Sequence, residues 1–558
     1  MRHFFIAFTL GIFVCRCAPG PPSEDDRRRP NILVILADDL GYTDLGILGS
    51  EIRTPNLDRL AREGMLLTNF LVSPTCSPTR AMLLTGVDSH LAGMGTMFGI
   101  ADANQAGQPG YEGVLNDRVV TFPTLLRDSG YRTYMVGKWH LGMEEHQGPH
   151  RRGFERSFAL LPGGASHFND AENLTEMDAP APYREDGREV LLPKDFYSSD
   201  FYTDKLIEYI QGGLGTDQPF FAFAAYTSPH WPLHVPDEYL NKYQGVYDQG
   251  YDALRARRFE NAKQEGLISP TAKLPARIEF ERSWDSLSEE ERKVSARTME
   301  IYAAMVENLD DNIGRLIEFL RQSGQLENTF ALFLPDNGPE GNPLAHIVDP
   351  DGWLERRFDN SYDNMGRINS YVYYSPGWAQ AVVAPFRLFK TFPTEGGVRV
   401  PAIVRFPDQN HDGERSDSVA TIKDVAPTIL ELAGVELPGT IFQGREIAPI
   451  EGTSMLPFLT GRSVSIHDDQ NFVMGWELFG RRAIRRGPWK LTWFFEPYGR
   501  ERWELFNVST DVAESRDLSE GEVEIKQELH ALWEEYVARN GVIVPTRDMS
   551  YAREPAAE

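Results

Sequence analysis

The chain has 558 residues, more than one hydrophobic core usually serves, so we expect two domains or one large domain with a smaller appendage. Hydrophobic residues make up 41% and aromatic residues 11% of the chain, which is typical of a globular interior rather than of a disordered protein. The formal net charge of −26 excludes a nucleic-acid binder of the usual kind, because contacts with phosphates need a basic face.

The N-terminus has the pattern of a secretory leader. Arg2 precedes an apolar run at residues 4–14, and small or turn-forming residues follow at 17–20. This run is shorter than the roughly 20 residues that span a bilayer and matches the apolar region of a leader. The sequence therefore predicts a signal peptide over residues 1–18, export to the periplasm or the medium, and no transmembrane segment. A lipoprotein anchored through Cys15 or Cys17 is the alternative.

Continuous apolar runs and alternating patterns follow in the first three quarters of the chain. Residues 30–37 end in Asp38 and Asp39, and residues 329–334 lead to Asp336 and Asn337; both runs are typical of buried parallel strands. Helical and strand patterns alternate between them, which indicates a doubly wound sheet with helices on both faces. We expect helices at residues 124–129, 201–210 and 294–320, strands at 131–136 and 220–226, and the last strand and helix of this sheet at 398–406 and 422–433.

The pattern changes after residue 440. Short strand-like runs separated by turns predict an antiparallel sheet, and residues 523–537 form a helix with one apolar face. The predicted fold is therefore α/β: a large doubly wound mixed sheet flanked by helices over residues 30–440, and a smaller C-terminal α+β domain over residues 441–558, with an antiparallel sheet and a packed helix. Residues 237–290 are charged and irregular, and we expect them to form an insertion near the substrate mouth. The short strands are expected at residues 473–478, 482–485, 489–495 and 503–508.

Cys76 stands out among the three cysteines of the chain. Because Cys15 and Cys17 lie in the expected leader, Cys76 has no partner for an internal disulfide in the mature chain. The polar residues after it, with Pro78 suited to a first helical turn, predict that Cys76 begins a helix. Free backbone N–H groups and the helix dipole attract an anion at such a position. The alternative is a buried free cysteine that packs as a small hydrophobe.

Oxygen-bearing side chains follow two of the predicted strands. Asp38, Asp39, Asp336 and Asn337 are expected at the carboxyl edge of the sheet, where sites form in open α/β folds. A set of oxygens without histidine or cysteine suits Ca²⁺ or Mg²⁺ rather than zinc, and three carboxylates give the charge-rich shell that calcium accepts. The alternative is that the adjacent aspartates only cap the following helix.

Cations and histidines follow the same kind of strand end. Lys138 and His140 come after the strand at 131–136, and their spacing lets both point one way if the backbone is extended. His230 follows the strand at 220–226, and Lys390 precedes a Glu-Gly-Gly turn. Taken singly, each of these four residues could instead have no role in a site: the lysines could be solvated on the surface, and the histidines could simply pack in the fold. An anion site in so acidic a chain needs clustered cations, and salt screens charges farther than about 8 Å away.

Taken together, these segments resemble the type I sulfatases of the alkaline phosphatase-like superfamily, and most of all the secreted bacterial arylsulfatases. The resemblance runs in order from residue 30 to the terminal helix. One departure is Pro339, which directly follows the Asp-Asn-Gly stretch and is expected to restrict that loop. The stretches that carry the resemblance are Pro-Thr-Cys-Ser-Pro-Thr-Arg, Gly-Lys-Trp-His-Leu-Gly, Arg-Gly-Phe-Glu-Arg-Ser-Phe, Pro-His-Trp-Pro-Leu, Asp-Asn-Gly and Glu-Gly-Gly-Val-Arg-Val-Pro.

The resemblance implies a modified nucleophile and a metal ion. A separate maturation enzyme would oxidise Cys76 to formylglycine, and one Ca²⁺ ion, with Mg²⁺ less favoured, would be held by Asp38, Asp39, Asp336 and Asn337. One hydroxyl of the hydrated aldehyde, its proton removed with the help of Asp336 and the metal, would attack sulfur and form a covalent sulfate hemiester.

The resemblance also assigns the remaining residues. Arg80 and Lys138 would hold the diol and neutralise the sulfate oxygens. Lys390 and His230 would bind the sulfate and protonate the departing alcohol or phenol. His140 would then deprotonate the second hydroxyl, so that inorganic sulfate leaves and the aldehyde returns.

The expected activity is that of a sulfuric ester hydrolase of the arylsulfatase type. One alternative is a phosphodiesterase or phosphonate monoester hydrolase of the same superfamily, which uses the same aldehyde and metal on phosphoryl groups. The other is a non-catalytic relative that binds sulfated polymers, against which the complete set of residues counts. The resemblance favours simple aryl or alkyl sulfates, although relatives also hydrolyse sulfated sugars.

Overall fold

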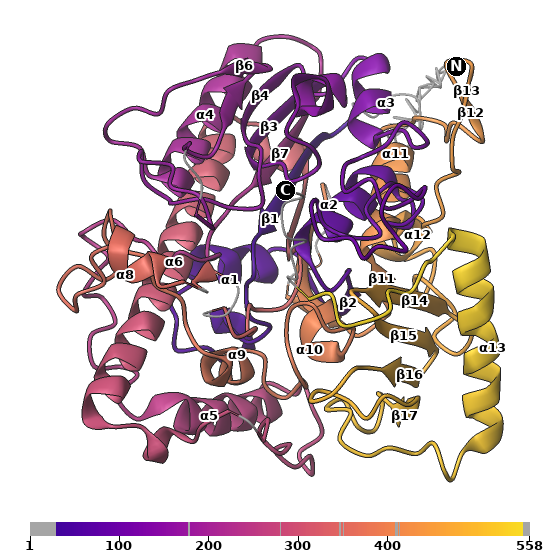
Figure 1. Ribbon diagram of the computed structural model, residues 1–558. Coiled ribbons are helices and arrows are strands. Elements are labelled where there is room, and N and C mark those ends of the chain that lie inside the picture. The colour runs from indigo at the N-terminus through magenta and orange to yellow at the C-terminus, as the bar shows by residue number, and fades with distance from the viewer. Residues whose placement is uncertain are drawn as a thin grey trace, which may run out of the picture.

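A large mixed sheet runs through the centre of the molecule (Figure 1). The computed structural model describes residues 29–550 except 177–178, 280, 345–347, 350, 408–410 and 412. The expected leader with Cys15 and Cys17 lies outside the described residues. Among the described residues, eleven strands form this sheet in the order β10-β2-β9-β8-β1-β7-β3-β4-β5-β6, with β11 also paired to β2. Its strands are β1 (Asn31–Ala37), β2 (Met65–Leu71), β3 (Arg132–Lys138), β4 (Arg156–Leu160), β5 (Tyr183–Glu185), β6 (Arg188–Glu189), β7 (Phe220–Ala225), β8 (Thr329–Pro335), β9 (Arg399–Arg405), β10 (Glu414–Ser416) and β11 (Ala420–Thr421).

Strand β1 explains why its sequence is a continuous apolar run. It lies between β7 and β8 and is parallel to both, so each of its faces is covered. Leu33 and Ile35 belong to one hydrophobic cluster, whereas Ile32 and Val34 belong to a second cluster on the opposite face. The alternation follows from side chains that point to opposite faces at successive positions of a strand.

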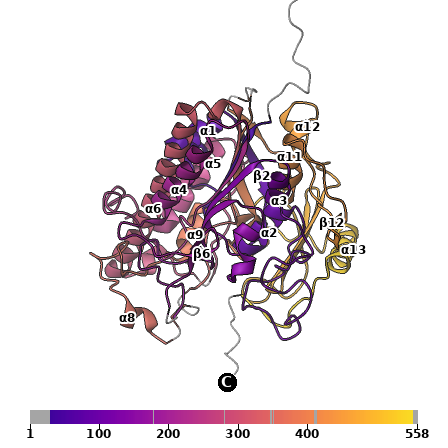
Figure 2. The same cartoon turned by 90° about the horizontal axis from the view of Figure 1, so that it is seen from above.

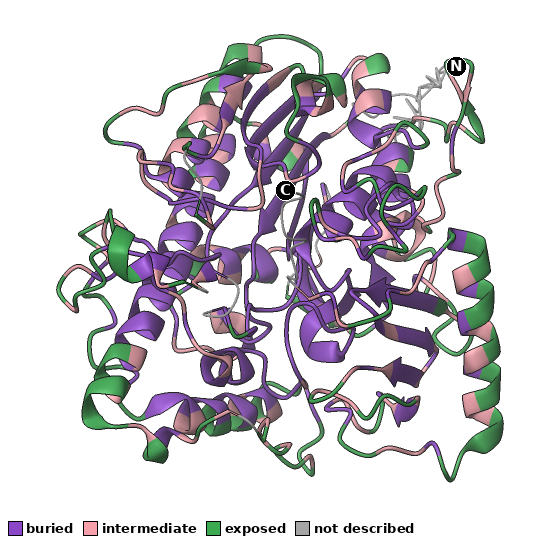
Figure 3. Cartoon of the chain, viewed as in Figure 1, coloured by how far each residue is buried: buried purple, intermediate pink, exposed green. Residues whose placement is uncertain are grey.

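Helices cover both faces of the sheet (Figure 2). One face packs against α1, α4 and α6, and the other against α2, α3 and α11. Figure 3 shows the strands of the sheet as buried, which agrees with the predicted doubly wound fold. The helices of this layer are α1 (Pro55–Arg62), α2 (Cys76–Thr85), α3 (Phe122–Asp128), α4 (Ser198–Gly213), α5 (Gly250–Gln264), α6 (Glu289–Gln322), α8 (Trp353–Arg357), α9 (Pro376–Val382), α10 (Glu395–Val398), α11 (Val425–Leu432) and α12 (Leu456–Leu459).

Strand β9 makes the sheet mixed, because it runs antiparallel to both of its neighbours, β8 and β2. The expectation that residues 398–406 form the last strand of the sheet is wrong. The short strands β10 and β11 follow in the chain and pair in parallel with β2. Their pairs involve so few residues that no strand pattern of ordinary length exists for them in the sequence.

The segment at residues 237–290 is not irregular throughout, as the sequence suggested. It contains α5, and Arg258 of this helix is fully buried, with Nη1 2.5 Å from Asp44 Oδ1 and Nη2 2.8 Å from Glu51 Oε1. A buried arginine conceals the apolar period by which a packed helix is recognised. The charged residue that suggested a solvated loop therefore holds the helix against the loop that follows β1.

A second sheet of four antiparallel strands forms the C-terminal part of the chain, as predicted. Leu529 and Trp533 of the final helix pack on one face of it. Met474 and Trp476 on the other face join the hydrophobic cluster of the main sheet, so the two parts share a core. No described helix is both long and apolar enough to cross a membrane. The elements of this part are β12 (Ile441–Phe442), β13 (Arg445–Glu446), β14 (Val473–Leu478), β15 (Arg481–Arg486), β16 (Trp489–Trp493), β17 (Glu504–Asn507) and α13 (Val523–Asn540).

Candidate active site

The carboxyl ends of β1 and β8 bring four oxygen-bearing side chains together. Ala37 pairs with Pro335 in the parallel register, so the next residues of the two strands, Asp38 and Asp336, come side by side. Asp39 has a left-handed backbone with φ of 64°, and its N–H donates to Asp336 Oδ1 at 3.4 Å. Asn337 Nδ2 donates to Asp39 Oδ1 at 2.7 Å. All four side chains are buried, as the two matching strand ends predicted.

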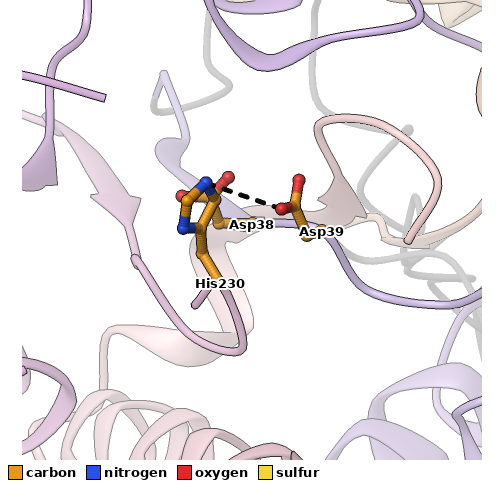
Figure 4. A group of neighbouring side chains, drawn as sticks. All are labelled: Asp38, Asp39 and His230. Carbon is orange, nitrogen blue, oxygen red and sulfur yellow. Dashed lines mark ion pairs between the residues drawn. The ribbon is translucent and has the colours of Figure 1, made fainter. Parts of the chain in front are cut away.

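This cluster fits a divalent cation. Asp38 Oδ1 and Asn337 Oδ1 are buried and accept no hydrogen bond from any described residue. Buried oxygens normally accept a hydrogen bond, so two that accept none, beside further carboxylates, are suited to binding a cation. Ligand atoms of Asp38, Asp39 and His230 lie within 4.8 Å of one another, and so do those of Asp38, Cys76 and Asp336. Figure 4 shows the first of these groups, in which His230 faces Asp39.

Cys76 is the first residue of α2, as its sequence predicted, and is 1% exposed. Burial raises the pKa of its thiol, so the side chain is not a thiolate at neutral pH. A protonated thiol is a weak nucleophile and a weak metal ligand. Position rather than thiol reactivity is therefore the distinguishing property of Cys76: it lies at a helix N-terminus and within reach of two carboxylates.

Three cationic side chains surround these carboxylates. Arg80 donates from Nε and Nη2 to Asp336 Oδ2, at 3.0 and 2.7 Å. Lys138 Nζ lies 2.7 Å from Asp38 Oδ2, and Lys390 Nζ lies 2.9 Å from Asp39 Oδ2. Lys138 is the last residue of β3 rather than a residue beyond it. Two of the cations also reach a second carboxylate: Arg80 Nη2 lies 3.8 Å from Asp38 Oδ2, and Lys390 Nζ lies 3.4 Å from Glu340 Oε2.

The charges in the site follow from these pairs. Burial alone would lower the pKa of Arg80, but the charges of Asp336 and Asp38 outweigh it and raise the pKa. Burial raises the pKa of Asp336 to about 6, and the neighbouring Asp38 adds to the effect. Burial also acts to raise the pKa of Asp39, but the charges of Lys390 and His230 lower it to about 2. With Glu340, whose Oε2 lies 3.4 Å from Lys390 Nζ, four buried carboxylates face three cations, so the formal charge of the cluster is close to −1 and a bound divalent cation would make it positive and attractive to an anion.

The two predicted histidines lie in the same site but differ in their hydrogen-bond and ion-pair partners. His230 places Nε2 3.5 Å from Asp39 Oδ2, and its Nδ1 lies 2.5 Å from the carbonyl oxygen of Trp231. Burial lowers the pKa of His230, although Asp39 opposes this. Burial also lowers the pKa of His140, and the positive charges of Lys138 and Arg80 lower it further.

The extended backbone under which Lys138 and His140 would point the same way is not present at His140. Its φ is 56°, in the left-handed region, so Lys138 and His140 do not share one strand direction. The ring lies against Gly163, where an added Cβ would be only 2.7 Å from His140 Cε1. The bend at the strand end therefore places this ring, and the absent side chain at position 163 leaves room for it.

Sequence reasoning missed residues that orient the site. His167, in the loop after β4, is buried with Nε2 3.0 Å from the carbonyl oxygen of His230 and Nδ1 2.7 Å from Ser198 Oγ. Asn342 donates to the carbonyl oxygen of Lys390 at 3.2 Å. Pro339, the residue that departs from the family pattern, accepts at its carbonyl from the Lys390 N–H at 3.0 Å. Only the tertiary fold brings these residues together, so the sequence offered no spacing by which to find them.

Comparison with known proteins decides the family. The family model described as Sulfatase matches residues 30–435, and the model described as N-sulphoglucosamine sulphohydrolase, C-terminal, matches residues 386–539. The chain belongs to the sulfatase family. It is therefore a sulfuric ester hydrolase, which confirms the expected reaction class.

Two relatives of this sulfatase align with most of its sequence. It is 46% identical over 538 residues to an uncharacterised sulfatase of Schizosaccharomyces pombe, covering 94% of this chain and 96% of that protein. It is 40% identical over 441 residues to the arylsulfatase of Klebsiella aerogenes, covering 78% of this chain and 93% of that protein. Both of these relatives are sulfatases, so they give no support to a phosphodiesterase.

Solved structures share the fold of this sulfatase. The crystal structure of Ps i-CgsB in complex with k-i-k-neocarrahexaose matches with a TM-score of 0.65 and 24% identity, over 93% of this chain and 94% of that chain. The structure of BT4656 in complex with its substrate D-glucosamine-2-N,6-O-disulfate matches with a TM-score of 0.60 and 22% identity, over 92% and 98%. The mixed sheet and the C-terminal sheet are therefore features that other solved structures share.

Proposed function

We propose that this sulfatase is a formylglycine-dependent arylsulfatase that uses Ca²⁺. The observation that carries the proposal is the position of Cys76, at the N-terminus of α2 and within 4.8 Å of carboxylate oxygens of Asp38 and Asp336. In the structure the Cys76 Sγ stands in for the oxygens of the modified residue. Once hydrated, the aldehyde supplies one hydroxyl to attack sulfur and a second through which sulfate is later expelled.

Asp38, Asp39, Asp336 and Asn337 would hold the metal ion. Their donor set is all oxygen, and the unsatisfied Asp38 Oδ1 and Asn337 Oδ1 supply ligand atoms. Three carboxylates favour Ca²⁺ over Mg²⁺, which keeps more of its water. When bound, such a cation withdraws charge from oxygens beside it and offsets the charge of the sulfate.

The side chains around Cys76 bind and orient the ester. Arg80 and Lys138 are fixed by their carboxylate partners, so their remaining N–H groups present a rigid set of donors to the residue at position 76 and to sulfate oxygens. Lys390 is held by Asp39, with Nζ 2.9 Å from Oδ2, and would donate to the sulfate and to the leaving oxygen. These donors are ordered before substrate arrives, which is the condition for stabilising charge as it develops.

Proton transfer falls to the two histidines. Nδ1 of His230 donates to the carbonyl of Trp231, so Nε2 is the nitrogen left to meet the leaving oxygen. Nε2 would give a proton only from the imidazolium form, which burial disfavours and the charge of Asp39 favours. His140 has a lowered pKa and is neutral near pH 7, and its buried Nδ1 has no partner among the described residues. A neutral imidazole can accept the proton of the second hydroxyl, so His140 would act as the base of the second half-reaction.

Hydrolysis of 4-nitrophenyl sulfate tests this function against its closest rival. The protein, produced with a formylglycine-generating enzyme, is assayed on 4-nitrophenyl sulfate and on bis(4-nitrophenyl) phosphate. We expect the sulfate ester to be the better substrate, with turnover that scales with the fraction of aldehyde at position 76 found by peptide mass mapping. Full activity with an intact thiol at position 76, or a strong preference for the phosphodiester, would overturn the proposal.

The alcohol portion of the substrate follows from the relatives only in part. The Klebsiella aerogenes relative is an arylsulfatase, and a more distant relative, 26% identical, is the N-acetylglucosamine-6-O-sulfatase of Bacteroides thetaiotaomicron. We favour aryl and small alkyl sulfates because the arylsulfatase is the more similar of the two. A panel of aryl, alkyl and monosaccharide sulfates ranks these classes by kcat/KM.

Processing and organisation complete the proposal. We propose export of the chain, with removal of residues 1–18, and conversion of Cys76 by a separate maturation enzyme. We also propose that residues 30–440 form the catalytic domain and 441–558 the C-terminal subdomain. Mass spectrometry of the exported protein locates its N-terminus, and a start within residues 1–10 would contradict the leader.

A further inference from the structure

Arg481 links the C-terminal sheet to the loop that carries Lys390. It is the first residue of β15 and is 1% exposed. Its guanidinium carbon lies 3.6 Å from the centre of the Phe392 ring, and Nη1 donates to the Thr391 hydroxyl. Its Nη2 donates to Asp548 Oδ2 at 3.1 Å and to Ser550 Oγ at 2.9 Å. A side chain of the second sheet thus ends one residue away from Lys390.

Thr391 needs this support because of its backbone. Its φ is 75°, a left-handed conformation that β-branched residues rarely adopt. Its N–H donates to the carbonyl oxygen of Pro74 at 2.6 Å, and its hydroxyl donates to Asn342 Oδ1 at 3.1 Å while accepting from Arg481. The hydroxyl therefore joins Arg481 to Asn342, and the N–H joins the loop to the segment just before Cys76.

The same hydrogen bonds fix Lys390. Its N–H donates to the Pro339 carbonyl at 3.0 Å, and its own carbonyl accepts from Asn342 Nδ2 at 3.2 Å. The side chain then reaches Asp39, where Nζ lies 2.9 Å from Oδ2. Asn342 contacts both residues of the pair and also donates to Glu340 Oε1, from its N–H at 2.9 Å and from Nδ2 at 2.6 Å. The Thr391 hydroxyl that Arg481 holds is the contact that fixes the oxygen end of the Asn342 amide.

We propose that Arg481 is a positioning residue for Lys390, acting through Thr391 and Asn342. The inference rests on the proposed role of Lys390 in binding the ester. Arg481 suits this task because the face of its planar guanidinium stacks on Phe392 while its edge donates in fixed directions. The C-terminal sheet would thereby contribute to catalysis indirectly, since the guanidinium of Arg481 is buried and engaged by Thr391, Asp548 and Ser550.

The last described residues of the chain belong to the same arrangement. Asp548 and Ser550 accept from Arg481, and Met549 N–H donates to the Phe479 carbonyl at 3.1 Å. Thr546 donates from its N–H and its hydroxyl to Asp102 Oδ2, each at 2.7 Å. The end of the chain therefore holds Arg481 from the side opposite Thr391.

The test compares Arg481→Met with a matched control on the same strand, in the protein carrying formylglycine. Arg482 is the next residue of β15, and its guanidinium carbon lies 3.9 Å over Trp493 on the other face of the sheet. With 4-nitrophenyl sulfate we expect Arg481→Met to lower kcat by roughly 10- to 100-fold, because displacement of a catalytic group by about 1 Å can cost a factor of about 100. Arg482→Met should change kcat by less than about 2-fold, as expected for a surface stacking contact far from the reacting atoms.

A double-mutant cycle separates positioning of Lys390 from a general structural effect. If Arg481 acts through Lys390, adding Arg481→Met to Lys390→Ala lowers kcat by less than about 3-fold, since coupled residues are not additive. Full multiplication of the two losses would overturn the inference, and so would an unchanged kcat in Arg481→Met. If Lys390→Ala is itself fully active, the proposed role of Lys390 fails; if Lys390→Ala is impaired while Arg481→Met is not, this inference alone fails.

Thr391→Val keeps the proposal testable if Arg481→Met does not fold, as judged by circular dichroism. Valine keeps the shape and the β-branch of threonine but removes the hydroxyl that joins Arg481 to Asn342. We expect a loss of kcat in the same direction, with KM changed less than kcat. Wild-type kcat in a folded Thr391→Val protein would overturn the inference.

Discussion

Cys76 occupies a position in which a thiol has little chemistry of its own. Burial raises its pKa, and Arg80 and Lys138 are already paired with Asp336 and Asp38 rather than with the sulfur. Catalytic thiols are instead held as thiolates by a neighbouring cation or histidine. The surroundings of Cys76 therefore do not activate a thiol, which agrees with the proposed conversion of this residue.

Cys76→Ala is expected to lower kcat on 4-nitrophenyl sulfate by roughly 10⁴-fold or more, because loss of a covalent nucleophile removes the reaction path itself. Ser77→Ala deletes an atom of similar size at the next position of α2 and should keep activity within a few-fold. Both variants are compared by steady-state kinetics and by circular dichroism. Substantial activity in a folded Cys76→Ala protein would exclude position 76 as the nucleophile.

His90 gives the molecule a pH dependence that is separate from catalysis. It is buried, with Nδ1 2.9 Å from Asp88 Oδ1 and Nε2 3.3 Å from Glu477 Oε2. Burial alone would lower the pKa of His90, but hydrogen bonds to Asp88 and Glu477 outweigh it and raise the pKa to about 9. The rings of Tyr111 and Tyr536 also face His90, and neither carries a charge near neutral pH.

The charge of His90 should stabilise the fold below its ordinary pKa of about 6.5, and this contribution should be lost as pH rises through about 9. The shift corresponds to roughly 3 kcal/mol in the free energy of unfolding. Urea unfolding at pH 6, 8 and 10 measures it, with His90→Asn expected to remove most of the dependence and His530→Gln, on the half-exposed face of α13, expected to keep it. If the free energy of unfolding changed equally with pH in wild type and in His90→Asn, this assignment would be refuted.

At the scale of single elements, the sequence predicted those whose pattern is local. β1 and β8 are continuous apolar runs that end in acidic residues, and α2 begins at Cys76 as its turn-prone start indicated. The common edge of parallel strands then placed Asp38 beside Asp336 without knowledge of the remaining topology. The core of the oxygen cluster proposed to hold a metal was therefore predictable from two strands and their register.

Elements that depend on distant partners could not be predicted in this way. The helix α5 is held by Arg258, whose carboxylate partners Asp44 and Glu51 lie at sequence separations of 214 and 207. The ring of His140 occupies space that a side chain at position 163 would fill, and Arg481 reaches Thr391 from another sheet. None of these contacts leaves a period or a spacing in the sequence, because each is made only after the chain has folded.

The strand β16 contains a buried ion cluster that fastens the second sheet to α10. Lys490 Nζ lies 2.8 Å from Glu395 Oε1 and 3.2 Å from Glu514 Oε1, and all three side chains are fully buried. Lys490→Met would remove the cation that both buried carboxylates share and leave Arg399, at 3.5 Å, as the ion-pair partner of Glu395, at a cost of about 3–5 kcal/mol. We expect a large fall in the thermal midpoint, measured by calorimetry, whereas Lys194→Met in an exposed loop should leave it nearly unchanged. A midpoint in Lys490→Met close to wild type would show that the cluster contributes little.

At the scale of the whole molecule, the charge of the surface and the charge of the site differ. The chain carries a formal charge of −26, yet the buried cluster around Cys76 sets three cations against four carboxylates, Glu340 included, and so carries a formal charge of only about −1. Surface carboxylates beyond about 8 Å are screened at physiological salt, whereas buried pairs are not. A divalent cation at this cluster would therefore make the site locally positive within an acidic protein, which is what an anionic ester requires.

Removal of calcium tests this arrangement. Because the formal charge of the cluster is only about −1 without a metal, we expect the chelated protein to stay folded but to lose nearly all turnover. Calcium at about 100 times its dissociation constant should add about 3 kcal/mol to the free energy of unfolding, seen as a thermal midpoint that rises with calcium concentration. The protein is treated with EGTA and then with Ca²⁺ or Mg²⁺, and it is followed by calorimetry and by hydrolysis of 4-nitrophenyl sulfate. Ca²⁺ should restore both the thermal midpoint and turnover.

Asp38→Asn, which weakens the ligand set, is the matched variant: its thermal midpoint should rise less than that of wild type when calcium is added. Turnover that persists after exhaustive chelation, with no response of the midpoint to either ion, would contradict the assignment of Asp38, Asp39, Asp336 and Asn337 as metal ligands.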